Sequence, residues 1–198
     1  MGNHTDLRVV RTRQMIKNAF LELMEEVGFA KITVEGITKK AFISRNTFYL
    51  HYTDKFDLLN SIEDETLLGV KDIVKEMPFE IMRTKGLADS KPISILIAVY
   101  QYISDNSRFF SLMIKEGGDP RFLHKMTEMM KDLMNQNNMD THLRTPQRYM
   151  VAIIAGIQTS IIGEWLRGGM KETPEELANL IAAVFESAPK NLLKKPAE

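Results

Sequence analysis

The sequence predicts an all-α protein, and three observations support this fold class. Apolar residues recur at helical spacing along most of the 198 residues. Two short segments in the first third of the chain each begin with a residue that typically caps a helix. No segment alternates apolar and polar residues for long enough to require a strand. Because these short helices occupy only the first third, we expect a second, larger helical domain behind them.

The first helix is indicated by a single apolar stripe that ends at Gly28, a residue type that often terminates helices. Such a stripe needs a partner surface, so this helix should pack across the two short helices that follow. The stripe consists of Ile16, Ala19, Phe20, Leu23, Met24 and Val27.

Residues 32–59 predict two short helices joined by a tight turn. Thr33 and Ser44 each precede apolar residues at helical spacing, so each hydroxyl should accept a hydrogen bond from the first turn. Around each cap, two apolar residues occupy the positions of a hydrophobic staple. About three residues remain for the turn, which is typical of a helix-turn-helix. The staple pairs are Ile32 with Ile37 and Ile43 with Phe48.

The second short helix has a surface suited to double-stranded DNA. It is too short to be stable alone, so Phe48 is predicted to anchor it to the core. Its other side carries groups that bond phosphates and base edges, and residues 31–52 hold four basic side chains against one acid. The candidate DNA-binding residues are Thr33, Lys39, Ser44, Arg45, Asn46, Thr47, Tyr49, His51 and Lys55.

Several short motifs in this region match a known family. They are Gly28-Phe29, Thr33-Val34, Ser44 with Thr47-Phe48-Tyr49, His51-Tyr52, Asp54-Lys55 and Leu58. Through them, residues 8–60 resemble the DNA-binding domain of TetR-type transcriptional regulators. The resemblance implies a three-helix DNA-binding domain over 8–60, followed by a helical regulatory and dimerisation domain over 61–187 that would also bind a ligand. Residues 188–198 are expected to form a flexible tail. It also implies that Thr47, Tyr49, His51 and Lys55 contact phosphates, with Arg45 and Asn46 nearest the base edges.

The chain departs from the family pattern at three positions. Phe42 and Asn46 stand where the family usually has glycine, and Gly36 stands where an acid is common. A phenylalanine at positive φ would be strained, so we expect the departure at Phe42 to affect the local geometry of the turn. Taken singly, the Phe48-Tyr49 pair would indicate core packing, and Lys39 with Lys40 a solvated face. Their combination with paired caps and staples favours DNA binding.

Composition excludes several other functions. The 26 basic and 26 acidic residues cancel, so any nucleic-acid binding must come from a local patch. The absence of cysteine and of an apolar signal segment favours the cytoplasm. No nucleotide-binding loop, nucleophile elbow or zinc-protease motif is present, so we expect neither an enzyme nor a cofactor. His124 and Glu128 lie four residues apart, a spacing more typical of a surface contact than of a metal site.

The rest of the chain predicts further helices. They cover residues 54–77, 92–104, 108–115, 122–135, 149–166 and 174–185, with a loop at 135–145 and a frayed tail from Pro189. Residues 149–166 are apolar, but polar residues and Glu164 interrupt a segment barely long enough to span a bilayer, so no membrane partner is expected. We expect this helix and the next to form a homodimer interface in which Gly156 permits close approach; the alternative is a monomeric core helix. The predicted interface residues are Ile153, Ile157, Ile161, Trp165, Leu177 and Ile181.

A methionine-rich stripe in residues 122–133 has two interpretations. One is a pocket for a small apolar effector, because methionine adapts to irregular ligands. The alternative is an ordinary core stripe. The candidate pocket residues are Tyr100, Phe109, Phe110, Met113, Met126 and Met130.

The sequence therefore predicts a homodimeric transcriptional regulator. A ligand-responsive repressor that binds a palindromic operator is favoured over an activator. Two alternatives stay open. Residues 107–113 and 163–169 resemble a subgroup that includes regulators of dihydroxyacetone kinase operons, some of which activate transcription with a protein coactivator. The other alternative is a helical receptor or adaptor that has lost DNA binding.

Overall fold

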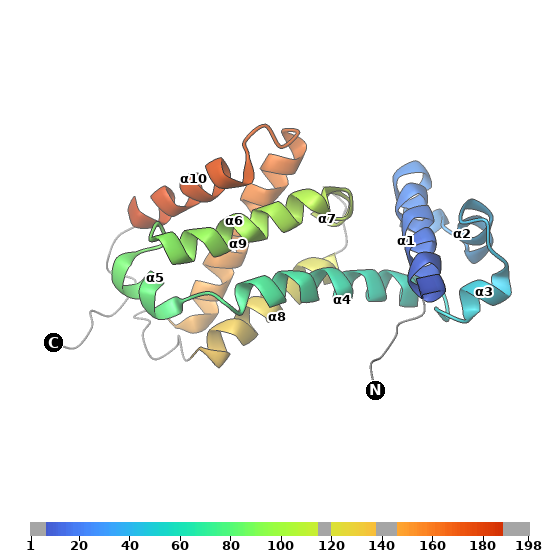
Figure 1. The fold of residues 1–198 in the computed structure, drawn as a ribbon, viewed down its shortest axis with the longest axis horizontal. Coiled ribbons are helices and arrows are strands. Elements are labelled where there is room, and N and C mark those ends of the chain that lie inside the picture. The colour runs from blue at the N-terminus through green and yellow to red at the C-terminus, as the bar shows by residue number, and fades with distance from the viewer. Residues whose placement is uncertain (1–6, 115–119, 138–145, 188–198) are drawn as a thin grey trace. The chain divides into compact units, whose positions relative to one another are not determined.

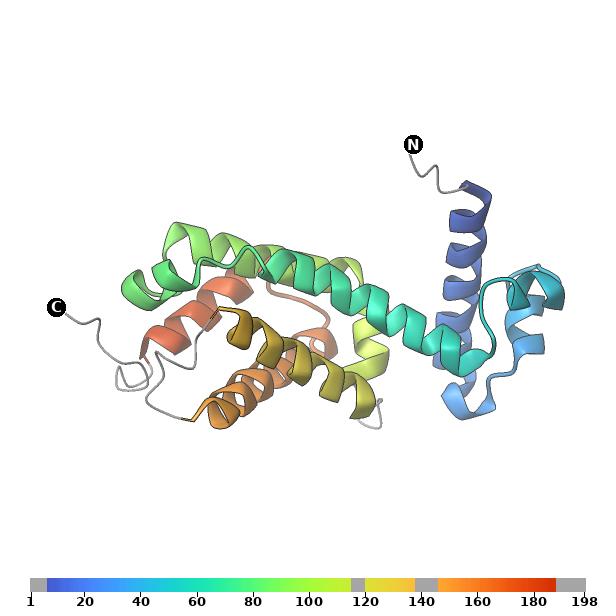
Figure 2. The ribbon, with the colours of Figure 1, turned by 90° about the horizontal axis from the view of Figure 1, so that it is seen from below.

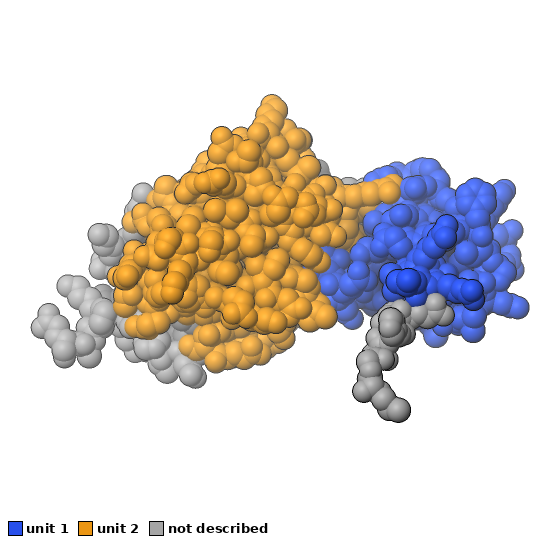
Figure 3. Space-filling model, in the orientation of Figure 1, with its two compact units in different colours: residues 1–66 blue, residues 67–198 orange. Residues whose placement is uncertain are grey.

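The computed structural model describes residues 7–114, 120–137 and 146–187, and each regular element in these ranges is a helix. The chain divides into two compact units, residues 1–66 and residues 67–198 (Figure 3). Each unit is described by itself. The predicted tail lies outside the described residues, as does most of the predicted loop at 135–145, whose first two residues belong to a helix.

The first unit is built from three helices, a 3₁₀ turn and the start of a fourth helix (Figure 1). The predicted stop of the first helix is confirmed, because Gly28 has a φ of 75°, which glycine adopts without steric cost. The elements are α1 (Leu7–Val27), η1 (Phe29–Lys31), α2 (Val34–Lys40), α3 (Arg45–Tyr49) and α4 (Lys55–Val74).

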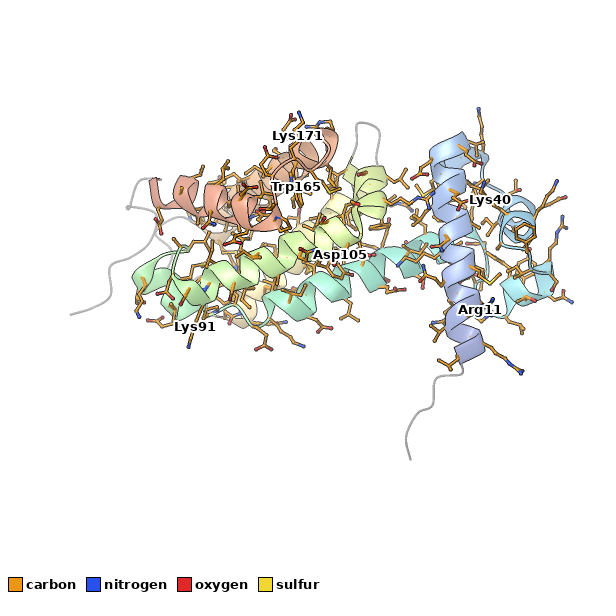
Figure 4. All side chains as sticks on the ribbon, turned by 45° about the horizontal axis from the view of Figure 1, so that its top comes forward. Arg11, Lys40, Lys91, Asp105, Trp165 and Lys171 are labelled. Atoms are coloured by element: carbon orange, nitrogen blue, oxygen red, sulfur yellow. The ribbon has the colours of Figure 1, made fainter. Side chains whose placement is uncertain are left out.

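A small apolar core holds these elements together. Helix α2 packs on α1, and the side chains that meet between the helices are almost fully inaccessible to water. At the surface, Lys40 of α2 forms ion pairs with Glu26 and Glu22 of α1 at 2.7 and 3.3 Å (Figure 4). Exposed pairs of this kind contribute up to about 1 kcal/mol each, so the apolar core dominates. The most deeply buried residues of this core are Ile16, Phe20, Ile37, Phe48, Leu58, Leu59 and Ile62.

Two carboxylates fix the start of α4. The Asp54 side chain accepts hydrogen bonds from the backbone N–H groups of Phe56 and Asp57, both at 2.8 Å. The Asp57 carboxylate in turn accepts from the backbone N–H of Thr53 at 2.8 Å. These bonds satisfy donors that a helix start otherwise leaves unpaired, so α4 begins at a defined residue.

The second unit packs its helices in neighbouring pairs. Helix α10 lies along α6, while α8 crosses α9 and α7 packs against α9 (Figures 1 and 2). Helix α5 was not predicted: Pro78 ends the preceding segment as expected, but its carbonyl then accepts from Met82 and starts a new helix. The elements are α5 (Phe79–Lys85), α6 (Ser90–Asp105), α7 (Ser107–Ile114), α8 (Pro120–Gln136), α9 (Gln147–Arg167) and α10 (Pro174–Ser187).

Aromatic side chains fill the core of the second unit. The rings of Tyr100 and Trp165 meet edge to face at 6.1 Å, and the Tyr100 hydroxyl donates to Gln158 at 2.9 Å. This burial raises the pKa of Tyr100 well above its usual value, so the phenol stays neutral at any physiological pH. The Phe109 and Phe122 rings also meet edge to face, at 5.2 Å. Such contacts add to the free energy gained by burial.

Helix α9 is long and apolar enough, by length and composition alone, to cross a membrane. Core helices of globular proteins have the same property. Here α9 packs against α7 and α8, and it buries Met150, Val151, Ile162 and Trp165 within the second unit.

Candidate nucleic-acid interface

The helix-turn-helix predicted from residues 32–59 is present, and both predicted caps are confirmed. The Thr33 hydroxyl accepts from the backbone N–H of Gly36 at 3.1 Å, and the Ser44 hydroxyl accepts from that of Thr47 at 3.0 Å. Phe48 of α3 has an exposed fraction of 0% and contributes to the core. The cap and the buried ring together determine which side of α3 faces outward.

The turn between α2 and α3 contains an unusual backbone conformation. Phe42 has a φ of 54°, in the left-handed region, and its side chain is 91% exposed. For an L-residue this conformation costs about 1–2 kcal/mol, and an exposed ring recovers little of that cost by packing. Phenylalanine at this position, where the family usually has glycine, is thus a real source of strain in the turn.

Replacing Phe42 by glycine should stabilise this turn. The variant F42G removes the Cβ that causes the strain, and after the greater flexibility of glycine is counted, the net gain should be about 0.5–1 kcal/mol. Amide hydrogen exchange in α2 and α3 measures the gain as a higher free energy of local opening. The matched variant F42A keeps the Cβ and removes the ring. Equal protection in F42A and F42G would show that the ring, and not the backbone, is the source of strain.

The outward side of α3 carries the polar side chains that the sequence singled out. Arg45 and Asn46 are exposed, Tyr49 is 55% exposed, and Thr47 is half-buried beside its cap. All four lie within one short helix whose opposite side holds Phe48 in the core. Three further predicted residues are exposed on the neighbouring elements: Thr33, Lys39 and Ser44. The arrangement places hydroxyl, amide and guanidinium donors on one small element, as contact with DNA requires.

His51 follows α3 and is half-buried. Burial lowers the pKa of His51, and the nearby positive charge of Arg13 lowers it further. The lowered pKa favours the neutral imidazole, which can donate one N–H to a phosphate. Arg13 of α1 was absent from the predicted site. Its only signal in the sequence was the basic segment near the start of α1, which includes Arg11 (Figure 4).

The Lys55 ammonium, which the sequence predicted to contact a phosphate, is engaged within the first unit. It donates to the backbone carbonyls of Phe29, Ala30 and Ile32 at 3.1, 3.1 and 2.9 Å. An ammonium has three N–H donors, so all of them are in use. The ammonium also lies 4.9 Å from the centre of the Phe29 ring, within the range of a cation–π contact. Lys55 therefore joins α4 to the η1 segment.

An ion pair that the sequence did not predict joins the two helices of the motif. Nη2 of Arg45, the first residue of α3, lies 2.6 Å from Oε2 of Glu35, near the start of α2. Both side chains are largely exposed, with 60% of Arg45 and 73% of Glu35 accessible. In the sequence, Glu35 is notable only as the single acid among four basic residues. Ten residues separate the partners, so helical periodicity gave no signal for this contact.

Four of the six predicted pocket residues form packed core. Met126 and Met130 on α8 are half-buried. A shallow depression of about 210 Å³ lies between α7 and α9, lined by Ser111, Ile114, Gly163, Leu166 and Arg167, and it includes none of the predicted six. The four buried residues are Tyr100, Phe109, Phe110 and Met113.

The predicted dimer face is corrected at three of its six positions. Trp165, Leu177 and Ile181 are buried within their own chain, so they have almost no surface to offer a partner. Ile153 is exposed, while Ile157 and Ile161 are half-buried. Helical spacing grouped these residues correctly but could not distinguish an inward stripe from an outward one. The large apolar side chains actually exposed on α9 and α10 are Tyr149, Ile153, Leu180 and Val184.

Comparison with known proteins agrees with this geometry. The family model of "Bacterial regulatory proteins, tetR family" matches residues 16–62, which contain the helix-turn-helix, and that of a "Transcriptional regulator C-terminal region" matches residues 90–187. The chain belongs to the TetR family of transcriptional regulators. As members of this family are DNA-binding regulators, the chain is not an enzyme.

Individual relatives are distant. The chain is 28% identical over 178 residues to the uncharacterized HTH-type transcriptional regulator YxbF of Bacillus subtilis, covering 87% of this chain but only 44% of that protein. It thus spans less than half the length of this relative. Among solved structures, NalD of Pseudomonas aeruginosa superposes with a TM-score of 0.67 at 16% identity, covering 94% and 99% of the two chains. FadR of Bacillus subtilis, solved with stearoyl-CoA, gives 0.61 at 17% identity, covering 89% and 98%. These likenesses establish the fold.

Proposed function

We propose that this TetR-family regulator binds a palindromic operator as a homodimer and represses transcription until a small apolar effector releases it. The observation that carries the proposal is the outward side of α3, where Arg45, Asn46 and Tyr49 are exposed opposite the buried Phe48. Arg45 and Asn46 are the residues proposed to contact base edges, and Thr47, Tyr49 and His51 those proposed to contact phosphates. A regulator of this kind acts in the cytoplasm, where its DNA is.

Dimerisation follows from the small size of the recognition element. Helix α3 has five residues and can contact only a few base pairs, so specificity requires a second copy on a symmetric half-site. The exposed apolar residues Tyr149 and Ile153 of α9, with Leu180 and Val184 of α10, support these helices as the interface. At exposed Gly156, no atom of the described residues outside its own stretch of helix lies within 4 Å of the point that a Cβ would occupy, which leaves room for a partner helix. Sedimentation equilibrium should give twice the 22.7 kDa chain mass, and a single-chain mass at micromolar concentration would contradict the proposal.

A methionine-rich cluster in the second unit supports an apolar effector. Met134, Met150 and Val151 form a buried cluster, and half-buried Met82 and Met130 pack against it. Unbranched thioether side chains rearrange at low cost, so this part of the core can open for a ligand more easily than the aromatic part around Tyr100. Among the structural relatives, FadR was solved with stearoyl-CoA, whose acyl chain is apolar. NalD is described as a repressor, which agrees with repression as the proposed activity.

Selection of genomic DNA fragments by the purified full chain tests the function. We expect enrichment of fragments that share an inverted repeat, and the level of transcription from those promoters in a deletion strain distinguishes repression from activation. Retention of no fragment above background would favour a helical receptor without DNA binding. An increase in transcript after deletion supports a repressor, whereas a decrease supports an activator with a protein partner.

The variant Tyr49→Ala tests the proposed phosphate contact. Tyr49 is exposed, so its removal should leave the fold intact while the affinity for the selected duplex falls about five- to tenfold at 0.1 M salt, the contribution of roughly one hydrogen-bonded contact. Titration by fluorescence anisotropy at fixed salt measures the change. The control is Leu68→Ala, an exposed apolar residue in the second unit, which should bind as the wild type does. Wild-type affinity in Tyr49→Ala would refute this placement of the phenol.

A further inference from the structure

We propose that Glu35 is a specificity-determining residue, whose carboxylate restrains Arg45 so that the guanidinium favours a base edge over the phosphate backbone. This inference rests on the DNA binding proposed above and assigns a role to a residue outside the predicted contact set. The observation behind it is the 2.6 Å ion pair between Arg45 Nη2 and Glu35 Oε2, which links the beginnings of the two helices of the motif.

The two helices that carry the ion pair begin at defined, capped residues. Glu35 lies in the first turn of α2, two residues after the Thr33 cap, and Arg45 directly follows the Ser44 cap. The helices that carry the pair are held by Ile37 and Phe48, both with an exposed fraction of 0%. The backbones of the two partners are therefore anchored, and only the side chains can move. The ion pair thus limits where the guanidinium of Arg45 can reach.

The pair is dispensable for the fold. Both side chains are mostly exposed, and an exposed ion pair contributes at most about 1 kcal/mol to stability. The ion pair matters more for DNA binding than for stability. Its carboxylate places a negative charge on the side of the motif that must approach phosphates. Glu35 is also the one acid among residues 31–52, so its charge directly reduces the local positive excess.

The effect of this charge differs between phosphates and bases. A phosphate is attracted to Arg45 chiefly by charge, and the adjacent carboxylate cancels much of that attraction. Guanine presents two neutral acceptors, O6 and N7, which are recognised by the geometry of two parallel N–H donors. The carboxylate engages Arg45 through Nη2, and a guanidinium has five N–H donors, so donors remain for a base edge. Glu35 therefore weakens binding to random DNA more than binding to the correct site.

The test compares Glu35→Gln with the wild-type full chain on two probes: a duplex selected by the wild type and a random duplex of equal length. Glutamine keeps the shape and removes the charge, which frees Arg45 for one phosphate contact. Affinity for the random duplex should rise about five- to tenfold at 0.1 M salt, and the slope of log affinity against log salt should steepen by about 0.9. Affinity for the selected duplex should change less, so the ratio of the two affinities falls.

Two controls separate this role from a general charge effect. Glu175→Gln makes the same change of net charge at an exposed position on α10, and both affinities should stay at the wild-type values. In an Arg45→Ala background, Glu35→Gln should no longer steepen the salt slope, because the guanidinium on which it acts is absent. An unchanged affinity ratio in Glu35→Gln, or an equal effect with and without Arg45, would overturn the inference. A wild type without preference for any duplex would instead refute the proposed function.

Discussion

Replacing Phe48 by alanine should lower the stability of the first unit by about 3–5 kcal/mol and abolish operator binding. The ring is fully buried and meets those of Tyr49 and Tyr52 at centroid distances of 5.6 and 5.8 Å. A helix of five residues has no stability of its own, so α3 depends on this anchor for its existence as a helix. Hydrogen exchange of the amides in α3 and anisotropy titration with the selected duplex measure the two effects.

The matched variant Phe48→Leu separates packing from the ring itself. Leucine keeps most of the buried volume, so the loss of stability should fall to about 1–1.5 kcal/mol and most of the DNA affinity should return. Wild-type affinity in Phe48→Ala would mean that α3 is held by its Ser44 cap alone, contrary to the anchoring role assigned to the ring.

Replacing Lys55 by methionine should destabilise the first unit by about 2–3 kcal/mol, because three carbonyls lose a charged donor and the side chain of similar length offers none. The carbonyls of Phe29, Ala30 and Ile32 all accept from this one ammonium, at 2.9–3.1 Å. Protection of amides in η1 and at the start of α4 should fall most. Chemical denaturation monitored by amide hydrogen exchange measures the loss of stability in each region.

The salt dependence of DNA binding distinguishes this structural role from a phosphate contact. If Lys55 only joins η1 to α4, Lys55→Met should leave the slope of log affinity against log salt unchanged once the protein is folded. A slope reduced by about 0.9 with wild-type stability would restore the phosphate contact predicted from the sequence. Lys55→Arg provides the control, since its planar fork keeps the charge but cannot converge on three carbonyls in the same way.

Local signals in the sequence predicted much of the first unit. Thr33, Ser44 and Gly28 act through bonds and backbone angles within a few residues of themselves, so their roles could be inferred without knowing the fold. Helix α5 escaped prediction because Pro78 signals both the end of one helix and the start of another, and only the path of the chain decides between them.

The direction of an apolar stripe was less predictable than its existence. Periodicity marked α9 and α10 as helices with strong apolar stripes, yet Trp165 and Ile181 face their own core while Leu180 and Val184 are exposed. A strongly apolar helix has more than one apolar side. Which side is buried depends on neighbours that are distant in sequence. The predicted pocket was limited in the same way: the sequence did not show which neighbours would cover its residues. Tyr100 and Phe110 pack against other core side chains.

By itself, the sequence determined the helical class, the helix-turn-helix and the family, because caps, staples and helix period act over about three to five residues. The tertiary structure alone decided what the side chains of Lys55 and Arg45 bind. Lys55 turns to carbonyls of η1 and Arg45 to Glu35, and these partners lie 10–26 residues away along the chain. A flexible side chain bonds to whichever group the fold brings within about 3 Å. The separation of two residues along the sequence does not predict that contact.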